Sequence, residues 1–579
     1  MSRPHHILPF TCMLLVHTTV AAAVAGVVTA PRPDSTAGAG PVAAGPLVDP
    51  AATALLARFK EATGGGAWDA VHATHTRGTV ETGGLSGAFD VWDEIGTGRT
   101  AGRFALGPMA GGGGYDGVAP WSLDPSGEVT VERGPEALEE GRNEAYRTAL
   151  AWWYPERWPA AMRLLAPRRE DGRLFQRVEI TPRGGRPFTL WLDNASALLE
   201  RAVERGGLQT TTTSFADWRS VALPSPAGAA APPRQVRLPF LVRSGNGEAK
   251  YDTVLRVATV ELDPPLAADA FAVPTSRAAD FALAGSAAAV TLPFSLRNHH
   301  VYVDVTVDGK GPLTMLFDSG GFNVVSPEAA TRLGLAAEGA LQGRGVGEQS
   351  EDVALSKVGE LRLGGATLRD QVFYVMSLAG MREIEGVDVA GVIGFEVLKR
   401  FVVEVDYAQR RLTLTLPERF DPATAGVALP FVFADHMPVV EGSVDGIAGR
   451  FTIDTGSRSE LSLHRPFVEQ HRLVERYHPG EEVTTGYGVG GAVRAQMTRA
   501  GALRLGEVEV TAPLTELVTS EKGALADPYL AGNVGGGLLL RFRVTFDYRH
   551  ERLYLAPGGD LGDEESPPAA GSDPVKKPP

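Results

Sequence analysis

The sequence predicts a mainly β protein in which an N-terminal α+β domain precedes two similar β lobes related by a pseudo-twofold axis. Three observations support this prediction. The chain contains 69 glycines and 41 prolines among many Val, Thr and Leu residues, which favours strands and turns over long helices. The triplet Asp-Ser/Thr-Gly occurs twice in the C-terminal half, each time after a hydrophobic run. The N-terminal half alternates short strand-like segments with few helical ones.

Length and charge restrict the class of protein. The 579 residues leave room for roughly three or four domains. The chain has 69 acidic against 55 basic residues and no basic cluster, which argues against a nucleic-acid partner, because such a partner requires a cationic face. The only cysteine, Cys12, lies in the N-terminal apolar segment. A processed chain would therefore contain no disulfide, no cysteine nucleophile and no cysteine-based metal site.

The N-terminus has the features of an export signal. Arg3 precedes an apolar run from Ile7 to about Val28, and Ala23-Val24-Ala25 offers the small residues that a signal peptidase requires. Residues 1–30 are predicted to be a signal peptide and 31–48 a flexible Ala/Gly/Pro-rich linker. The protein is thus expected in the periplasm or outside the cell. The alternative is membrane association through an uncleaved segment, although its threonines and His17 suit a bilayer poorly.

Residues 49–277 are predicted to form a separate domain. It begins with a helix over 52–63, in which Leu55, Leu56 and Phe59 share one face, and a second helical stretch covers 136–153. The strand-like runs around them indicate one curled antiparallel sheet packed on helices. His72 and His75 lie close together, but no third ligand is spaced for a metal, so both are predicted to be surface residues.

Several short stretches of this domain are similar to the periplasmic lipoprotein carriers of the LolA-like class. They are Ala62-Thr63-Gly64-Gly65, Tyr115-Asp116-Gly117 with Trp121, Pro182-Arg183-Gly184-Gly185 with Leu192-Asp193, and Phe215-Ala216-Asp217-Trp218-Arg219. The resemblance implies a half-open barrel whose concave face holds an acyl chain or another apolar ligand. Trp152, Trp153 and Trp158 either line such a cavity or form an ordinary core.

An Ala-rich linker at 278–289 leads into a repeated unit. Leu316-Phe317-Asp318-Ser319-Gly320 corresponds to Thr452-Ile453-Asp454-Thr455-Gly456, and the two aspartates lie 136 positions apart. Matching residues flank both triplets at similar shifts, among them Leu292-Pro293-Phe294 with Leu429-Pro430-Phe431 and Asp406-Tyr407 with Asp547-Tyr548. A constant order at nearly constant spacing indicates one domain that has been duplicated, as residues 290–418 and 427–557.

Each copy is expected to be a small all-β unit. A hairpin turns at Asp308-Gly309 or Asp445-Gly446, and the next strand delivers the aspartate to a turn. A short helix follows at 327–333 or 466–473, then a Gly-rich hairpin tip, and then Gly391-Val392-Ile393-Gly394 or Gly532-Asn533-Val534-Gly535. The polar, Pro-rich tail at 558–579 is expected to be disordered.

In this order of motifs, each unit resembles a β-barrel lobe of the retropepsin-like aspartic proteases, with both lobes on one chain as in pepsin. The resemblance implies that Asp318 and Asp454 are catalytic and that Ser319, Gly320, Thr455 and Gly456 support the site. It also implies two flaps over the substrate, formed by Gly345, Val346 and Gly347 and by Tyr487, Gly488 and Val489. A peptide or protein substrate, a monomeric chain and no metal or other cofactor are expected.

The chemistry of such a pair follows from electrostatics. Two carboxylates a few ångströms apart share one proton, because ionising both is unfavourable. The ionised member takes a proton from a water molecule that attacks a peptide carbonyl, and the protonated member stabilises the carbonyl oxygen. The sequence therefore predicts an exported aspartic endopeptidase. The alternative function is a non-catalytic exported protein that retains the fold to bind peptides or lipids.

The sequence departs from the family pattern at two positions. Gly321 replaces the usual alanine or serine, and Asn533 replaces an apolar residue.

Asp318-Ser319-Gly320-Gly321 also resembles the nucleophile loop of chymotrypsin-like serine proteases, but bulky Phe317 stands where that family has glycine. Gly486, Gly488 and Gly491 match a dinucleotide fingerprint without the helix and acidic residue that should follow. The matched histidines, His299 and His436, are predicted to make structural hydrogen bonds before the first strand of each copy.

Overall fold

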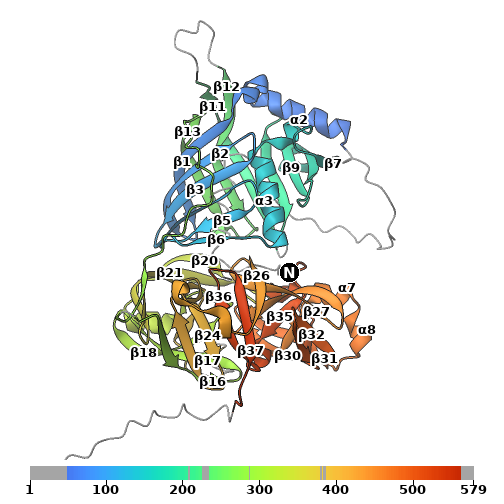
Figure 1. Cartoon of the computed structure of the whole chain (residues 1–579). Coiled ribbons are helices and arrows are strands. Elements are labelled where there is room, and N and C mark those ends of the chain that lie inside the picture. The colour runs from blue at the N-terminus through green and yellow to red at the C-terminus, as the bar shows by residue number, and fades with distance from the viewer. Residues whose placement is uncertain are drawn as a thin grey trace, which may run out of the picture. The chain divides into compact units, whose positions relative to one another are not determined.

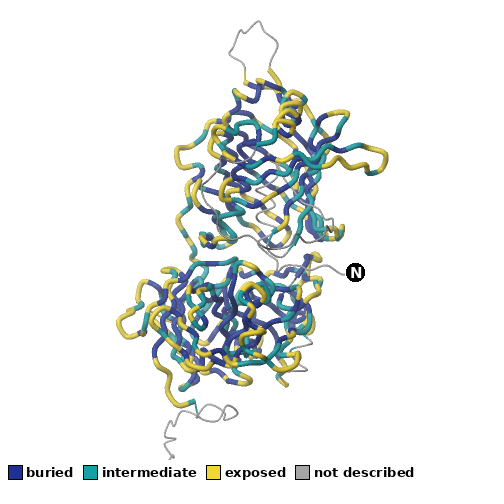
Figure 2. Tube along the Cα trace, turned by 90° about the vertical axis from the view of Figure 1, so that its right-hand side faces the viewer, coloured by how far each residue is buried: buried dark blue, intermediate teal, exposed yellow. Residues whose placement is uncertain are grey.

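The protein is described here by a computed structural model that covers residues 48–206, 209–224, 234–285, 287–343, 345–378, 381 and 386–561. The predicted signal peptide, nearly all of the first linker and residues 562–579 of the tail lie outside these ranges. The described chain forms two compact units. The first contains the residues up to Arg277 together with 338–345 and 349–355, and the second contains the remainder. In both units the buried residues fill the interior and the exposed ones lie mainly on loops (Figure 2).

The first unit is built on one 13-stranded sheet in which every strand runs antiparallel to its neighbours (Figure 1). Most neighbours are consecutive in the chain and are joined by hairpins, whereas β1 pairs with β13 and so links the two halves of the sheet. The strands are β1 (Ala73–Thr82), β2 (Leu85–Glu94), β3 (Arg99–Leu106), β4 (Met109–Tyr115), β5 (Pro120–Leu123), β6 (Val129–Val131), β7 (Ala160–Glu170), β8 (Arg173–Pro182), β9 (Phe188–Asp193), β10 (Leu199–Arg205), β11 (Thr210–Ala222), β12 (Gln235–Gly245) and β13 (Thr253–Leu262).

Two helices, α2 (Pro50–Ala62) and α3 (Pro135–Thr148), pack against this sheet (Figure 1). Asp49 caps α2 by accepting a hydrogen bond from the amide of Ala51, and the predicted face of Leu55, Leu56 and Phe59 is buried. The second helix ends at Thr148, before the predicted residue 153, because Leu150 takes a left-handed conformation with φ of 49°. No helix in the described ranges is long and apolar enough to cross a membrane.

The tryptophans that follow α3 belong to the core of this unit. Trp152 is buried and packs near Phe59, with ring centroids 6.4 Å apart. Trp153 packs on Phe59 and Trp68 and donates a hydrogen bond to the carbonyl of Leu56. These contacts favour the core interpretation over a cavity lining for Trp152 and Trp153.

The prediction that His75 is a surface residue is wrong. Its residue exposure is only 9%, because its ring stacks on Trp92 with centroids 4.1 Å apart. His75 and Trp92 lie directly opposite each other in β1 and β2, and Nε2 of His75 is 2.5 Å from Oδ1 of Asp90. The histidine is therefore a cross-strand packing residue. His72 agrees with the prediction, since its side chain is 82% exposed.

The second unit holds two lobes with the same order of elements. Its first lobe contains β14 (Phe281–Leu283), β16 (Ser295–Arg297), β17 (His300–Val307), β18 (Lys310–Asp318), β19 (Val324–Val325), α4 (Pro327–Leu333), β21 (Glu351–Leu363) from Ser356 onward, β22 (Ala366–Val375), β23 (Gly391–Gly394), α6 (Phe395–Leu398), β24 (Val402–Asp406) and β25 (Arg411–Thr415). β15 (Ala289–Pro293) precedes β16 and pairs with β25.

The second lobe contains β26 (Val427–Ala434), β27 (Met437–Val444), β28 (Ile447–Asp454), β29 (Leu461–Leu463), α7 (Arg465–Gln470), α8 (Leu473–Tyr477), β30 (Glu482–Gly488), β31 (Gly491–Arg499), β32 (Ala502–Leu505), β33 (Val508–Thr511), β34 (Leu514–Val518), β35 (Gly532–Gly535), α9 (Gly536–Leu539), β36 (Phe542–Asp547) and β37 (Arg552–Pro557). The single helix predicted at 466–473 is thus two short helices, since Arg472 is left-handed. The predicted mainly β fold is confirmed.

The two lobes present their aspartates in the same way. β18 runs parallel to β23 so that Asp318 lies opposite Gly394, and β28 runs parallel to β35 so that Asp454 lies opposite Gly535. β24 and β36 pair antiparallel, so β15, β24 and β25 of the first lobe continue the sheet of the second lobe, while the other strands of the first lobe form a separate sheet. Both aspartates consequently end buried central strands, where their positions are fixed by backbone pairing on both sides.

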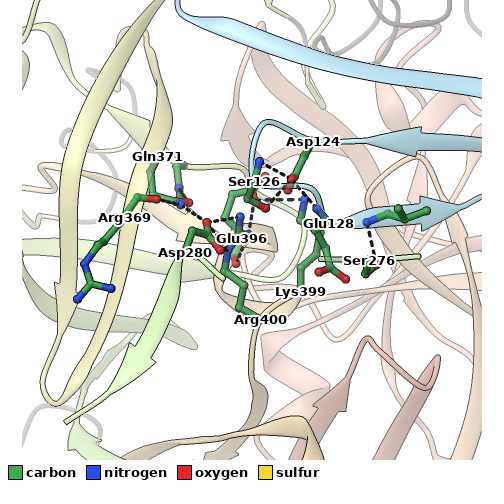
Figure 3. Close-up of polar contacts among 12 residues, drawn as sticks. Asp124, Ser126, Glu128, Ser276, Asp280, Arg369, Gln371, Glu396, Lys399 and Arg400 are labelled. Carbon is green, nitrogen blue, oxygen red and sulfur yellow. Dashed lines mark hydrogen bonds and ion pairs between the residues drawn. The ribbon is translucent and has the colours of Figure 1, made fainter. Parts of the chain in front are cut away.

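Residues of the predicted linker 278–289 are tied into the second unit. Asp280 pairs with Arg400 at 2.7 Å and accepts a hydrogen bond from Gln371 (Figure 3). Arg400 is buried and also bonds Glu396, so its charge is matched by two carboxylates. This network fixes the end of α6 directly after the strand that supports Asp318.

The stem of the first Gly-rich hairpin, formed by β20 (Glu338–Gly343) and the start of β21, belongs to the first unit. Gln342 is hydrogen-bonded to Asn246 and Glu248. Asp352 accepts hydrogen bonds from Lys250 at 2.8 Å and from Tyr251 at 2.6 Å. Polar side chains therefore hold this stem at both of its strands.

Candidate active site

The two Asp-Ser/Thr-Gly triplets form identical tight turns. The amide of Gly320 donates to Oδ1 of Asp318 at 2.7 Å, and the amide of Gly456 donates to Oδ1 of Asp454 at 2.9 Å. Each carboxyl group is therefore oriented by its own turn before any contact with the other lobe. A carboxylate that accepts backbone N–H bonds is stabilised in its ionised form.

The fold brings these two carboxyl groups close together. Asp454 acts on the carboxyl group of Asp318 through its charge and through side-chain hydrogen bonding, and both effects raise the pKa of Asp318. A Cβ atom at Gly456 would lie 2.4 Å from either carboxyl oxygen of Asp318, so only glycine leaves room for that carboxyl group. Gly456, the third residue of the second triplet, is thus required to accommodate the side chain of Asp318.

Ser319 and Thr455, both fully buried, brace the two turns across the pseudo-twofold axis. The hydroxyl of Ser319 donates to the carbonyl of Ile453 at 3.0 Å and accepts from the amide of Thr455 at 3.0 Å. The hydroxyl of Thr455 donates to the carbonyl of Phe317 at 3.1 Å and accepts from the amide of Ser319 at 2.9 Å. Four reciprocal hydrogen bonds therefore fix the spacing of the carboxyl groups.

A second brace consists of one histidine from each lobe. Nε2 of His436 donates to the carbonyl of Gly320 at 2.7 Å, and Nε2 of His300 donates to the carbonyl of Gly456 at 3.0 Å. The sequence matched His436 with His299, which is wrong by one residue, since Nδ1 of His299 instead contacts the carbonyl of Arg458. Only His300 stands 136 positions before His436, the spacing of the aspartates themselves. The predicted structural hydrogen bonds are present.

Tyr548 is a residue of the site that the sequence did not single out. It is buried, and its hydroxyl donates to the carbonyl of Ser319 at 3.2 Å. Burial and the two aspartates raise the pKa of Tyr548 well above its usual range, so the ring stays neutral. The repeated pair Asp406-Tyr407 and Asp547-Tyr548 was the only available signal, and it does not distinguish a site residue from a core residue.

Asp318 and His436 both have pKa values shifted by their surroundings. Burial and the neighbouring Asp454 raise the pKa of Asp318 well above its usual range. Burial lowers the pKa of His436, but Asp435, at 2.8 Å from Nδ1, and the carbonyl of Gly320 outweigh it, so the net shift is upward. Burial and Asp454 thus favour the protonated form of Asp318, and the contacts of His436 favour its charged ring.

Asn533, noted in the sequence as a departure from the apolar pattern, is a direct neighbour of the second aspartate. Its Nδ2 donates to Oδ2 of Asp454 at 3.1 Å, and its Oδ1 accepts from the hydroxyl of Thr452 at 2.5 Å. No sequence signal predicted this bond, because Thr452 and Asn533 meet only through the pairing of β28 with β35. The substitution therefore supplies an additional donor to the site.

The predicted flap tips meet within the second unit, while Gly345 falls with the first unit. The amide of Gly347 donates to the carbonyl of Val489 at 3.0 Å, and Val346 packs against the cluster of Val493, Val518 and Leu525. A Cβ atom at Gly488 would lie 2.5 Å from Val346. Tyr487 remains 52% exposed, so its predicted role over the site stays a prediction.

In the described part of the chain, no group of three or more His, Cys, Asp or Glu side chains is arranged to hold a metal ion.

The first lobe matches a known family. Residues 303–397, which include Asp318, match the family described as aspartyl protease, and this confirms the resemblance predicted from the sequence. A comparison with curated proteins found no match.

Similar solved structures include two proteases. A retropepsin-like aspartic protease from Rickettsia conorii is 18% identical, over 22% of this chain and 88% of that chain, with a TM-score of 0.17. An aspartic proteinase from Irpex lacteus is 12% identical, over 48% of this chain and 100% of that chain, with a TM-score of 0.32. A putative outer membrane lipoprotein-sorting protein domain from Vibrio parahaemolyticus is 12% identical, over 38% and 96%, with a TM-score of 0.26.

Proposed function

We propose that the protein is an aspartic endopeptidase that hydrolyses peptide bonds with the pair Asp318 and Asp454 and a water molecule. The observation that carries the proposal is that four reciprocal hydrogen bonds couple the two triplets and so bring the two carboxyl groups together, with the pKa of Asp318 raised well above its usual range by burial and by Asp454. A pair in this state holds one proton and one negative charge at mildly acidic pH. It therefore contains an acid and a base within reach of one water molecule.

Each supporting residue then has a role in this proposal. Ser319, Gly320, Thr455 and Gly456 hold the carboxyl groups at a fixed spacing, because any rotation of one turn would break its four reciprocal bonds with the other. The flap tips would open for an extended peptide and close over it, which excludes water from the reacting carbonyl. Backbone pairing between the flaps and the peptide would follow the logic of strand addition.

The proposal includes the context of the enzyme. Residues 1–30 would direct export, the site would act in the periplasm or outside the cell, and one chain would supply both lobes without a second subunit. The curled sheet of the first unit would bind an apolar or lipid ligand, as its resemblance to lipoprotein carriers implies. These steps are testable separately from the chemistry.

The test is peptide cleavage by the purified protein at mildly acidic pH. The wild type is expected to cleave members of a peptide library, and Asp454→Asn is expected to lose at least a thousandfold in kcat/KM, because the pair then lacks its base. A pepstatin-type inhibitor should block the wild type, whereas a serine-directed reagent should not. If wild type and variant were equally inert over many peptides and pH values, the non-catalytic binding function would replace this proposal.

A further inference from the structure

The Oδ1 atoms of the two aspartates accept equivalent backbone hydrogen bonds. Oδ1 of Asp318 accepts from the amide of Gly320 at 2.7 Å, and Oδ1 of Asp454 accepts from the amide of Gly456 at 2.9 Å. The backbone turns alone therefore give neither carboxyl group a preference for the shared proton. A preference can come from the surroundings of the Oδ2 atoms and from nearby charges.

The Oδ2 atoms of Asp454 and Asp318 have different surroundings. Oδ2 of Asp454 accepts a hydrogen bond from Nδ2 of Asn533 at 3.1 Å. The residue at this position of the first lobe is Val392, which lies opposite Leu316 as Asn533 lies opposite Thr452. A Cβ atom at Gly321 would lie 2.8 Å from Oδ2 of Asp318 and 2.8 Å from a methyl group of Val392, so this oxygen and the apolar side chain lie on either side of the same glycine.

Thr452 fixes the orientation of the Asn533 amide. The threonine hydroxyl donates to Oδ1 of Asn533 at 2.5 Å, and both residues are buried. With its oxygen engaged by the hydroxyl, the amide directs its NH₂ group to Asp454. The reverse orientation would set an amide oxygen against a carboxylate, which is repulsive. The first lobe has Leu316 in place of the threonine and offers no such support.

We propose that Asn533 is a positioning residue that keeps the shared proton on Asp318 and leaves Asp454 as the carboxylate that activates water. The inference rests on the proposed function, since it assigns the acid and the base within that pair. A hydrogen-bond donor aimed at a carboxylate stabilises its ionised form, while a carboxyl group facing apolar atoms retains its proton. The asymmetry of the two lobes at this position therefore has a chemical consequence.

Other charged and titratable groups lie near the two carboxyl groups. His436, itself paired with Asp435, favours the ionised form of Asp318 and so opposes the proposed assignment. Burial and Asp454 nevertheless raise the pKa of Asp318 well above its usual range. Tyr548 is neutral and faces both aspartates, and His300 contacts the turn of Asp454 through the carbonyl of Gly456.

The assignment gives a balanced first step. The carboxylate of Asp454 takes one proton from water as the water oxygen forms a bond to the peptide carbon. The carbonyl π electrons move to the oxygen, which receives the proton from Asp318. The products are a neutral gem-diol, a protonated Asp454 and an ionised Asp318, so no charge or atom is left over.

The first test is the pH profile of kcat/KM for Asn533→Val, which makes the second lobe resemble the first. The acidic limb is expected to move upward by about one pH unit, because the carboxylate loses a donor. Thr452→Val, which leaves the amide but removes its support, should move the limb in the same direction by less. Thr452→Ser keeps the hydroxyl and should restore the wild-type profile. A purely structural role would reduce stability without moving the limb.

The second test does not depend on activity. Carboxyl-carbon NMR of protein labelled at aspartate Cγ, with signals assigned through Asp318→Asn and Asp454→Asn, should show Asp454 ionising before Asp318 in the wild type. Asn533→Val should reduce the separation of the two steps. The inference is overturned if Asp318 ionises first, or if the wild type and Asn533→Val titrate identically. An absence of peptide cleavage would instead refute the proposed function and leave this titration to decide the assignment.

Discussion

His436 combines a structural contact with a titratable charge at the residue scale. Its Nε2 faces the carbonyl of Gly320 and its Nδ1 faces the carboxylate of Asp435, so both ring nitrogens point at acceptors. Only the imidazolium ion donates from both nitrogens. The raised pKa of His436 has this geometric cause, and the charge lies near Asp318 in a ring environment of Phe322 and Phe395.

Asp435→Asn is expected to lower the pKa of His436, because the variant removes the carboxylate that favours the charged ring. The charged form stabilises the fold fully below the unfolded value of 6.5, and this stabilisation is lost as pH rises through the raised folded value. The variant should therefore lose about 1 kcal/mol of unfolding free energy at pH 6 and progressively less in alkali. NMR titration of the ring checks the shift, with the exposed ring of His72 as an internal control that should not move.

The sequence predicted the two aspartates and their triplets because these residues repeat as short contiguous motifs. It did not predict the roles of His300, Tyr548 or Asn533, because each acts across a strand pair or across the lobes. The misplaced equivalence of His299 shows the same limit, since two adjacent histidines look alike until the register of the following strand is known. His75 was placed on the surface because its burial depends on Trp92 in the neighbouring strand.

At the scale of elements, the turns after β18 and β28 act as one structure. Thr455→Val is expected to leave the amide of Ser319 and the carbonyl of Phe317 without their partner, at a cost of about 3 kcal/mol in unfolding free energy. Thr455→Ser keeps both bonds and should lose less than about 1 kcal/mol. Chemical denaturation followed by far-ultraviolet circular dichroism measures both variants. Equal stability of the two would contradict the proposed importance of the brace.

The helix boundaries agree with the sequence-based prediction where local residues determine them. The helix at 327–333 begins after Ser326, which caps it, and ends at left-handed Gly334, as such signals predict. The helix expected at 136–153 was too long because Leu150 adopts a left-handed conformation without a glycine or proline to announce it. Tertiary packing of the tryptophans that follow decides that boundary.

At the scale of the whole molecule, all eight tryptophans lie between positions 68 and 218, in the first unit. Tryptophan fluorescence therefore reports on this unit alone, and a single transition for the whole chain should not be assumed.

Glu144 and Asp93 are buried carboxyl groups of the first unit. Burial is the main cause that raises the pKa of Glu144 to about 8 and that of Asp93 to about 6.

These raised values make the first unit less stable in alkali. Between the unfolded value of 4.5 and about pH 8, folded Glu144 keeps a proton that the unfolded chain releases, so the unfolding free energy falls as pH rises. Glu144→Gln should remove about 4 kcal/mol of this fall in unfolding free energy between pH 5 and pH 9, measured by denaturation followed by tryptophan fluorescence. Glu156→Gln, an exposed change in the same unit, should leave the slope intact. An unchanged slope in Glu144→Gln would show that the carboxyl group titrates normally.

The reciprocal bonds between the triplets have a consequence for biosynthesis. The first triplet lacks its final partners until the second half of the repeat has emerged from the ribosome, and Tyr548, which bonds Ser319, is translated later still. A nascent polypeptide would thus carry only disconnected half-sites. The proposed hydrolytic activity would therefore be acquired late, and the growing chain would be shielded from digesting itself or its neighbours during synthesis.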